Sequence, residues 1–459
     1  MYRSGRFFFT KAGHEPNHGI SLSSILRRAI SSPGVKLHGA GFIVTESEAD
    51  MLLAAIPLET SRSARAAIIR DYRNGRDLTD KPRGVRVIDA FGLSADELRA
   101  QHPGVYQWLL DRVKPERDAK GTSKDGAGYA KLWWLHGKPR QEMRKQLTGL
   151  QRYIATVVTA KHRLFQFLDA SILADDALIC IASADAFNLG ILSSQLHIQW
   201  ALATGSMLED RPRYIKTTCF ETFPFPDADT GLTPELTHKI RSLAEQINAH
   251  RKKQLAVNAY DAGVTLTGLY NVLEKLRSGE TLTAKDKTLH EHGLVGVLRS
   301  LHDELDAAVL AAYGWNDLHP ITAPEALLAR LVALNAQRAA EEAAGNVRWL
   351  RPAFQAPGQG QQTQVQQTGI AMATQVAPAG KGKSIKSAAA QPWPATMAEQ
   401  VKAVADVLAQ AGSALDLDAI AAHFSSRGRW RERLPAILDT LVALGRIHAQ
   451  SAVLWVNVG

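Results

Sequence analysis

The sequence NLGILSSQLHIQWALATGSMLEDRPRYIKTTCFETFPFPD, residues 188–227, begins as an apolar helical run and ends in two Phe-Pro steps. Proline fixes its own φ and restricts the preceding residue to extended backbone. The Phe-Pro pairs therefore predict a rigid exit from one part of the chain into the next, anchored by Phe223 and Phe225; a simple linker is the alternative. His197, inside the apolar run, is predicted to be a packed, hydrogen-bonded core histidine. The stretch contains no nucleophile motif, metal-ligand cluster or phosphate loop, so it predicts architecture rather than chemistry.

Composition places the chain among globular proteins of several domains. It has 459 residues, a net charge of +9 and an apolar fraction of 45%. A run of ~18 apolar residues is absent from the sequence, which argues against a membrane span. The N-terminus lacks the apolar core of a signal peptide. With two cysteines, Cys180 and Cys219, the sequence predicts a cytoplasmic protein with reduced thiols.

Breaks in composition divide the chain. Residues 224–236 hold three prolines and a glycine, and Thr233-Pro234 is a typical helix start. Residues 353–396, rich in Gln, Gly, Ala, Ser and Thr, cannot bury enough apolar surface to fold. The predicted fold is multidomain α+β. Its parts are an uncertain N-terminal remnant (1–34), a mixed α/β domain (35–228), an all-helical domain (229–352), a flexible, disordered linker (353–396) and a small winged-helix-like tail (397–459).

Local patterns give the expected elements of the α/β domain. Apolar, β-rich runs predict strands at 84–93, 152–158, 163–173 and 177–183. Ser94 with Glu97 forms a capping box that predicts one amphipathic helix over 94–113. Thr45 with Glu48 predicts another helix start. The tail has the order helix, turn, helix, basic turn, helix and two short strands, which is typical of a winged helix.

Two possible sites of small-molecule or metal binding are weak. The Gly-Ala-Gly of residues 39–41 is followed by a strand-like run instead of a helix, so we expect a structural hairpin or bulge instead of a nucleotide loop. His290 and His292 have no Cys or carboxylate at ligand spacing and are expected to face solvent. The sequence therefore predicts no metal site.

Basic segments favour a polyanionic partner. The excess of positive charge lies mostly in residues 1–228, and arginine can fork onto a phosphate or a guanine edge. A solvated loop is the alternative for each segment. The candidate DNA contacts lie in 70–89, in 159–165 and in the basic turn of the tail; they are Arg70, Tyr72, Arg73, Arg76, Lys81, Arg83, Arg86, Lys161, His162, Arg163, Arg429 and Arg431.

Taken together, eight ordered segments resemble a known family. They include IRDYRNGRDLTDKPRGVRVIDAFGLS (69–94), WWLHGKPRQEMR (133–144), RYIATVVTAKHRLFQFLDASIL (152–173) and RYIKTTCFETFPFPD (213–227). From about Val35 to Gln355 the chain resembles the C-terminal half of adenine-specific, class I S-adenosylmethionine-dependent DNA methyltransferases of MmeI-like restriction–modification systems. That half comprises a target-recognition domain and a helical C-terminal domain.

The resemblance implies a function in DNA recognition. Catalysis in the family needs a cofactor glycine motif and an Asn/Asp-Pro-Pro-aromatic tetrapeptide, which holds the flipped adenine. The nearest strings here, FPFP (223–226) and QPWP (391–394), lack the polar first residue. We therefore expect double-stranded DNA and a methyltransferase catalytic domain or subunit as partners, with S-adenosylmethionine and the catalytic residues supplied by the complete enzyme.

Two other interpretations remain open at the level of sequence. The near-neutral 229–352 region and the tail fit a non-catalytic protein-docking module of a defence complex. Alternatively, the chain is a truncated gene fragment, with which the uncertain residues 1–34 are consistent. The target DNA sequence does not follow from the residues.

Overall fold

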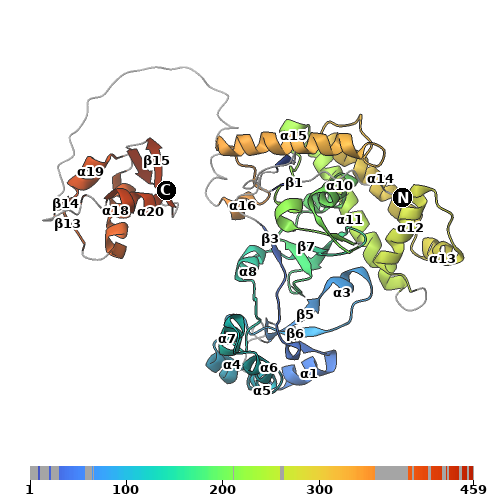
Figure 1. Ribbon diagram of the computed structural model, residues 1–459, viewed down its shortest axis with the longest axis horizontal. Coiled ribbons are helices and arrows are strands. Elements are labelled where there is room, and N and C mark those ends of the chain that lie inside the picture. Colours follow the sequence, from blue (N-terminus) through green and yellow to red (C-terminus); the bar gives the residue numbers. More distant parts are fainter. Residues whose placement is uncertain are drawn as a thin grey trace. The chain divides into compact units, whose positions relative to one another are not determined.

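The computed structural model describes residues 9–10, 20–21, 30–56, 65, 67–209, 211–258, 263–356, 391–394, 397–411, 415–425, 431, 434–443, 447–451 and 454–457. The chain divides into two compact units, 1–370 and 371–459 (Figure 1). The first unit has two hydrophobic cores and the second has one. In the described residues, no helix is long and apolar enough to span a membrane.

A four-stranded antiparallel sheet lies between the two cores of the first unit. Its order is β3-β10-β7-β8. Because side chains alternate along a strand, Ile154, Ile179 and Ile181 enter one core, whereas Tyr153 and Cys180 enter the other. The strands are β3 (Ser31–Pro33), β7 (Arg152–Val157), β8 (Phe165–Asp169) and β10 (Leu178–Ile181).

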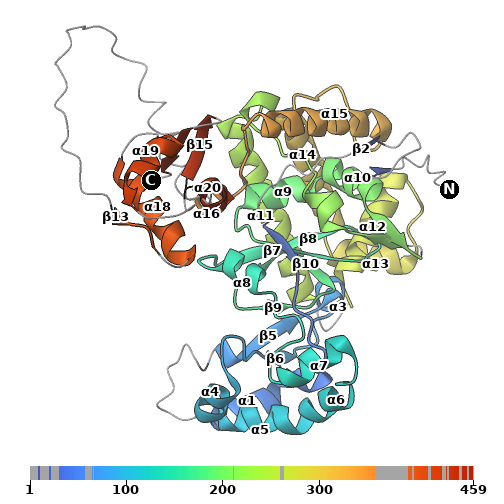
Figure 2. The same cartoon turned by 60° about the vertical axis from the view of Figure 1, so that its left-hand side comes forward.

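The second core lies in a smaller lobe, in which short helices surround a second four-stranded sheet with shorter strands, of order β4-β6-β5-β9 (Figure 2). We keep the name four-stranded sheet for the β3-β10-β7-β8 sheet. The strands are β4 (Ile43–Val44), β5 (Ile69–Arg73), β6 (Arg86–Ile88) and β9 (Leu173–Ala174). The helices are η1 (Ala40–Phe42), α1 (Glu46–Ala54), α3 (Gly75–Thr79), α4 (Ala95–Gln101), α5 (Pro103–Arg112), α6 (Lys114–Ala119), α7 (Lys124–Lys131) and α8 (Gln141–Leu147).

The capping boxes predicted at Thr45/Glu48 and Ser94/Glu97 are present. The single helix expected over 94–113 is wrong: it is broken between α4 and α5 at His102-Pro103. Proline lacks the N–H that would continue the ladder and clashes with the preceding turn, but it suits the first turn of a new helix. The pattern of apolar residues continues across the break, and it therefore resembles one helix.

The run that precedes the Phe-Pro exit also forms two helices. They are α9 (Ala186–Ser193) and α10 (Gln195–Thr204), and Ser194 caps the second. His197 is fully buried, and its Nε2 lies 3.0 Å from the hydroxyl of Tyr214, as predicted for a core histidine. After α10 come a hairpin of β11 (Ser206–Leu208) and β12 (Arg211–Arg213) and the π-turn Lys216–Phe220.

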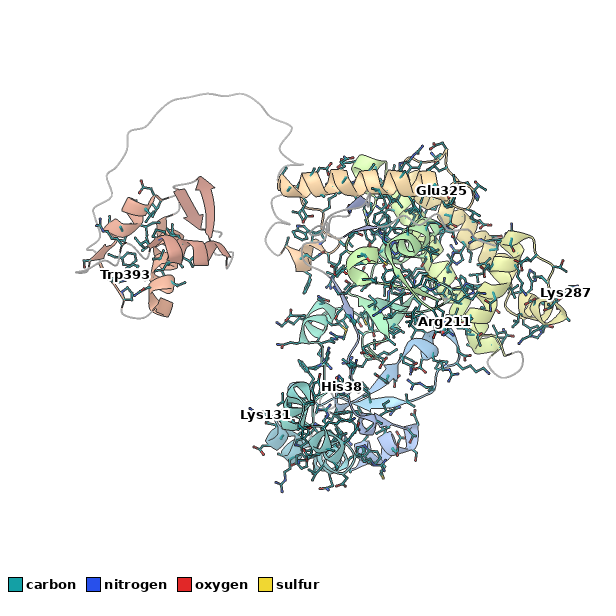
Figure 3. All side chains as sticks on the ribbon, viewed as in Figure 1. His38, Lys131, Arg211, Lys287, Glu325 and Trp393 are labelled. Atoms are coloured by element: carbon teal, nitrogen blue, oxygen red, sulfur yellow. The ribbon has the colours of Figure 1, made fainter. Side chains whose placement is uncertain are left out.

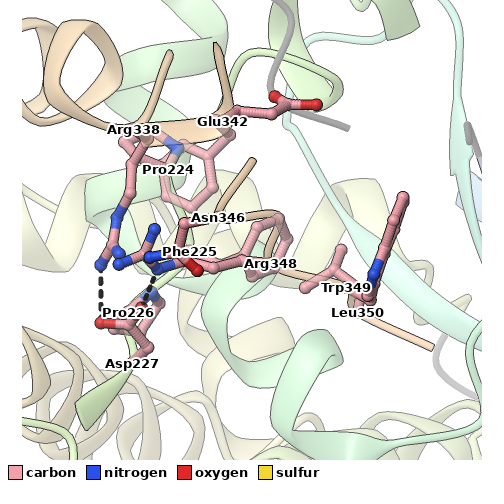
Figure 4. Close-up of a pocket in the computed structure, with 11 residues that line it drawn as sticks. Pro224, Phe225, Pro226, Asp227, Arg338, Glu342, Asn346, Arg348, Trp349 and Leu350 are labelled. Atoms are coloured by element: carbon pink, nitrogen blue, oxygen red, sulfur yellow. Dashed lines mark hydrogen bonds and ion pairs between the residues drawn. The ribbon is translucent and has the colours of Figure 1, made fainter. Parts of the chain in front are cut away.

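The Phe-Pro exit is anchored as predicted. Phe223 is fully buried and Phe225 nearly so, with ring centroids 5.2 Å apart at 84°. The Pro224 carbonyl accepts a hydrogen bond of 2.7 Å from the hydroxyl of Tyr313. Asp227 ends the exit between two guanidinium groups, those of Arg338 and Arg348, beside a cavity of about 120 Å³ (Figure 4).

The helices that follow pack on the first core. Thr233 caps α11 from Pro234, as expected. The boundary predicted at 228 does not separate two cores, because Ile240 and Leu305 share one cluster with Ile154 and Phe165. The elements are η3 (Ala228–Thr230), α11 (Pro234–Val257), α12 (Leu266–Ser278), α13 (Ala284–His292), α14 (Val295–Ala312), α15 (Pro324–Ala343) and α16 (Pro352–Gln355).

The second unit has the element order predicted for its tail. Three helices precede a hairpin, and Leu408, Ile420 and Leu438 lie in its core. Its elements are β13 (Gln391–Pro392), α18 (Met397–Ala411), α19 (Leu417–Ala422), β14 (Phe424–Ser425), α20 (Leu434–Ala443), β15 (Ile447–Ser451) and β16 (Leu454–Asn457). Most of the predicted linker 353–396, and residues 1–8, 11–19 and 22–29 of the N-terminal remnant, lie outside the described residues. The short strands β1 (Phe9–Thr10) and β2 (Ile20–Ser21) pair in parallel.

Candidate nucleic-acid interface

One end of the four-stranded sheet gathers segments that are far apart in the sequence. Antiparallel pairing sets Pro33 opposite Ile179, Leu178 opposite Val157, and Thr156 opposite Phe165. The last residue of β3, the first of β10, the last of β7 and the first of β8 therefore meet at the same end. The 159–163 loop and Lys36 extend from this end, and we call it the basic sheet end.

A projecting hairpin, β11–β12, joins the basic sheet end. Thr159 bridges to Arg213, and the amide of Ala160 donates to the Pro212 carbonyl at 3.3 Å. Arg211 and Arg213 are exposed, and the side chains of Met207 and Leu208 are 60% and 53% exposed. Figure 3 shows Arg211 on the side of the sheet that faces the smaller lobe.

Sequence reasoning missed this hairpin. Its strands are three residues each and wholly exposed in β11, so they carry no alternating apolar pattern. The available signal was weaker. Gly205 precedes the first strand, and Glu209, whose φ is +57°, adopts the left-handed backbone that tight hairpin turns require. In the sequence, Gly205 and the polar residues between two short runs were the signs of it.

Helix α3 packs against the same end. Asn74 caps it by accepting from the amides of Arg76 and Asp77. A Cβ at Gly75 would lie 2.9 Å from Cγ1 of Val157, so glycine is needed for this close approach. The side chain of Arg76 is 77% exposed, and it forms a long ion pair of 3.9 Å with Asp80. Of the arginines predicted as contacts in residues 70–86, Arg76 is the one most open to a phosphate.

Other predicted contacts are held by the protein itself. Arg83 donates to Asp77, at 2.8 Å from Nη2. Burial acts to raise the pKa of Asp77, but the hydrogen bonds from Arg83 and the Asn74 amide keep that pKa below its ordinary value. Arg86 lies within 4.0 Å of three carboxylates, those of Glu46, Asp50 and Asp71.

Arg70 and Arg73 also have intramolecular partners. The Arg70 guanidinium donates to the carbonyls of Ser171 and Ala170 at 2.8 and 2.9 Å and lies 3.4 Å from Asp89. Arg73 donates to the carbonyl of Tyr72 at 3.0 Å. Arg70 therefore ties β5 to the 170–171 turn, whereas the bond of Arg73 stays within β5. Lys81 is exposed.

Two predicted contacts are buried, which counts against their assignment to DNA. Tyr72 is 2% exposed and hydrogen-bonds Asp175 through its hydroxyl. Arg163 is 6% exposed, and its guanidinium donates to Thr156 Oγ1 and to the carbonyls of Val157, Val158 and Pro212. Burial lowers the pKa of Arg163 to about 10. This arginine therefore holds the hairpin to the sheet.

The remaining loop residues face outward and towards the helices. Lys161 Nζ lies 2.8 Å from Asn271 Oδ1 and 3.4 Å from Glu274, and its side chain is 59% exposed. His162 contacts the same Asn271 oxygen at 2.8 Å. In the second unit, Arg431 is exposed, whereas Arg429 lies outside the described residues. Arg76, Lys161 and His162 thus lie on segments that meet at the basic sheet end.

The Gly-Ala-Gly segment packs closely against helix α5. A Cβ at Gly41 would lie 2.7 Å from the carbonyl oxygen of Arg112, and the Gly41 carbonyl accepts from Trp108 Nε1 at 2.9 Å. Its glycine therefore allows the close packing of this segment against α5. Within the described residues, no group of three His, Cys, Asp or Glu side chains could hold a metal ion.

The part of the chain that contains the basic sheet end is similar to known proteins. Residues 59–227 match the family model described as MmeI, target recognition domain. DNA methyltransferase A of Bacillus subtilis (strain 168) is 29% identical over 102 residues, which are 22% of this chain and 10% of that protein.

A solved structure shares the fold. The type IIL restriction–modification enzyme MmeI, solved in complex with DNA, superposes with a TM-score of 0.51 at 20% identity. The superposition covers 72% of this chain and 38% of that enzyme, so the present chain spans well under half of its length. Residues 59–227 are thus a target recognition domain of the MmeI type, within a fold shared with part of that restriction–modification enzyme.

Proposed function

We propose that this chain is the DNA-recognition part of a type IIL restriction–modification enzyme. It grips duplex DNA and selects a short target sequence. Transfer of a methyl group from S-adenosylmethionine to adenine N6 belongs to a methyltransferase catalytic part, which this chain accompanies. The observation that carries the proposal is the convergence of α3, the 159–163 loop and the β11–β12 hairpin at one sheet end, inside the residues that match the family model.

The geometry supports two different roles for the residues of the basic sheet end. Arg76 and Lys161 are more than half exposed, and such cations bind phosphates without regard to sequence. The hairpin projects two exposed arginines, Arg211 and Arg213. A two-stranded ribbon fits the major groove, where an arginine can fork onto guanine O6 and N7. Phosphate contacts would fix the position, and the hairpin would read bases.

A selection from random duplexes tests the proposal. The full chain is incubated with a pool of duplexes that share a randomised centre, and the bound fraction is sequenced over several rounds. We expect enrichment of one short sequence. Arg211→Ala/Arg213→Ala should still bind but discriminate less at one or two positions, by about 1–3 kcal/mol each. Lys287→Ala, which removes an exposed cation on α13, is the control.

Two results would contradict the proposal. The first is a wild-type chain that binds duplexes without enriching any sequence. The second is a hairpin variant that enriches the same sequence as strongly as Lys287→Ala does.

A further inference from the structure

A second concave site lies where the smaller lobe meets the four-stranded sheet. It is a cavity of about 350 Å³ lined by Lys36, His38, Lys120, Tyr129 and Lys138, among others. None of these residues was predicted as a DNA contact. Figure 3 labels His38 at this junction.

The backbone sets two of the cations side by side. Lys36 and Lys138 exchange both hydrogen bonds of an antiparallel bridge, with N–O distances of 3.1 and 3.0 Å. Directly opposed residues of such a bridge project from the same face, and both side chains line the cavity. The pairing therefore fixes the backbone positions from which both lysine side chains enter the cavity wall.

The aromatic wall of the cavity is also fixed. His38 stacks on Tyr129 with ring centroids 4.6 Å apart at 22°. A Cβ at Gly137 would lie 2.3 Å from Cδ2 of His38, so the ring packs directly on the Gly137 backbone. His38 has a φ of +52°, and a non-glycine residue is held in this region only where its surroundings determine it. The aromatic wall is therefore preformed.

Positive charge exceeds negative charge around the cavity. Arg117 is 2% exposed and donates to the backbone carbonyls of His38 and Tyr129, two residues of the cavity wall, and to that of Leu37 at 2.8 Å. Lys36 lies 3.5 Å from Asp176 and Lys120 lies 2.6 Å from Glu116. Lys138 has no carboxylate within ion-pair distance in the part of the chain that the structure describes. Four cations therefore face two carboxylates.

The pKa of His38 reflects this surplus of positive charge. Burial, then Lys36, Arg117 and Lys138, hold the pKa of its imidazole below the ordinary value, and only Asp176 acts to raise it. An anion bound in the cavity would act in the opposite direction, because it favours the protonated ring. A rise in this pKa would therefore be a readout of anion binding in the cavity.

We propose that this cavity is a phosphate-binding site, in which Lys36 and Lys138 provide the charge and Lys120 closes one side. Two neighbouring ammonium groups, close to a buried guanidinium that donates to carbonyls, attract the oxygens of a phosphate. The phosphate is that of a DNA backbone or of a free nucleotide. The first source rests on the proposed function, and the second does not.

The test has one arm for each source. In the first, duplex affinity of the full chain is measured at several salt concentrations for wild type, Lys36→Gln/Lys138→Gln and Lys287→Gln. Each phosphate contact contributes about 0.9 to the slope of log K against log salt. If the site holds a DNA phosphate, the double variant should have a shallower slope by about 0.9, whereas Lys287→Gln should match wild type.

In the second arm, the pKa of His38 in the wild-type chain is followed by NMR, with His38→Asn identifying the signal. Saturating duplex, inorganic phosphate or adenosine monophosphate should raise this pKa by about 1 unit if it occupies the site. A response to duplex supports the DNA source. A response to phosphate or the nucleotide, with an unchanged salt slope, supports a free nucleotide.

The inference fails if the double variant matches Lys287→Gln in slope and none of the three probes moves the pKa of His38. It is separable from the proposed function. A chain that binds no duplex at all contradicts the proposed function, while the phosphate and nucleotide titrations of His38 still decide whether the cavity binds phosphate.

Discussion

Arg163 illustrates how one residue type serves either structure or recognition. Its guanidinium is buried and satisfies the carbonyls of Val157, Val158 and Pro212, while Arg76 projects into solvent. In sequence both are arginines in basic segments. Burial decides between them, because a buried guanidinium is retained only where carbonyls or carboxylates accept its hydrogen bonds.

Arg163→Met should therefore lower the free energy of unfolding by about 3 kcal/mol, since it removes the buried donor of the hydrogen bonds to Thr156 Oγ1 and to the carbonyls of Val157, Val158 and Pro212. Urea denaturation measures the change. The matched substitution Arg76→Met should change stability by less than about 0.5 kcal/mol, because that side chain is 77% exposed. Equal losses in the two variants would show that Arg163 does not hold the hairpin to the sheet.

His197 makes stability depend on pH. Burial, with a smaller effect of Arg163, lowers its pKa to about 3. The unfolded chain, in which the pKa is about 6.5, binds more protons in acid than the folded chain does. The contribution of His197 is therefore complete above pH 6.5 and is lost as the pH falls through 6.5 towards 3.

Between pH 7 and pH 5 this loss amounts to about 2 kcal/mol. In His197→Gln, which can still hydrogen-bond Tyr214 but does not titrate, the difference in unfolding free energy between the two pH values should be smaller by that amount. Denaturant titrations at both pH values measure it. An unchanged difference would mean that His197 is protonated in the folded chain or that its burial is incomplete.

At the scale of elements, the Phe-Pro exit joins the α/β part to the helices. Phe223 contacts His197 with ring centroids 4.5 Å apart, and the Thr222 carbonyl accepts from Asn335 Nδ2 at 2.7 Å. Asp227 ends the exit in ion pairs with Arg338 and Arg348 (Figure 4). The exit is therefore fastened by ring packing, a hydrogen bond and charge.

Phe223→Ala should destabilise the first unit by about 3–5 kcal/mol, the usual cost of removing a fully buried phenylalanine. Thermal or urea unfolding followed by far-UV circular dichroism measures it. Val297→Ala, at a side chain that is 50% exposed on α14, is the control and should cost little. A loss below about 1 kcal/mol for Phe223→Ala would mean that the exit is a linker and not an anchor.

Sequence patterns predicted the elements that local chemistry determines. The caps at Thr45, Ser94 and Thr233 and the strand at 152–157 are present. The break before Pro103 was missed because the apolar pattern continues through it. In the candidate site, the basic segments were found, but spacing alone cannot separate the buried Arg163 from exposed cations, since that depends on which strands pair.

The whole molecule shows the same limit. A composition break at 224–236 predicted a domain boundary, yet Ile240 packs in one core with Ile154. Composition records where the chain turns, not which faces it buries afterwards. The basic sheet end likewise exists only after β3, β7, β8 and β10 pair, and it collects residues from 36 to 213 that no local motif connects.

The central claim is that the basic sheet end grips duplex DNA through its phosphates. The most direct test measures the duplex affinity of the full chain from about 50 to 300 mM salt. Counterion release is readily resolved over this roughly sixfold range. We predict a linear fall of log K with log salt, and for Arg76→Ala/Lys161→Ala a slope shallower by about 1.8. A wild-type affinity that does not change with salt, or a double variant with the wild-type slope, would contradict the claim.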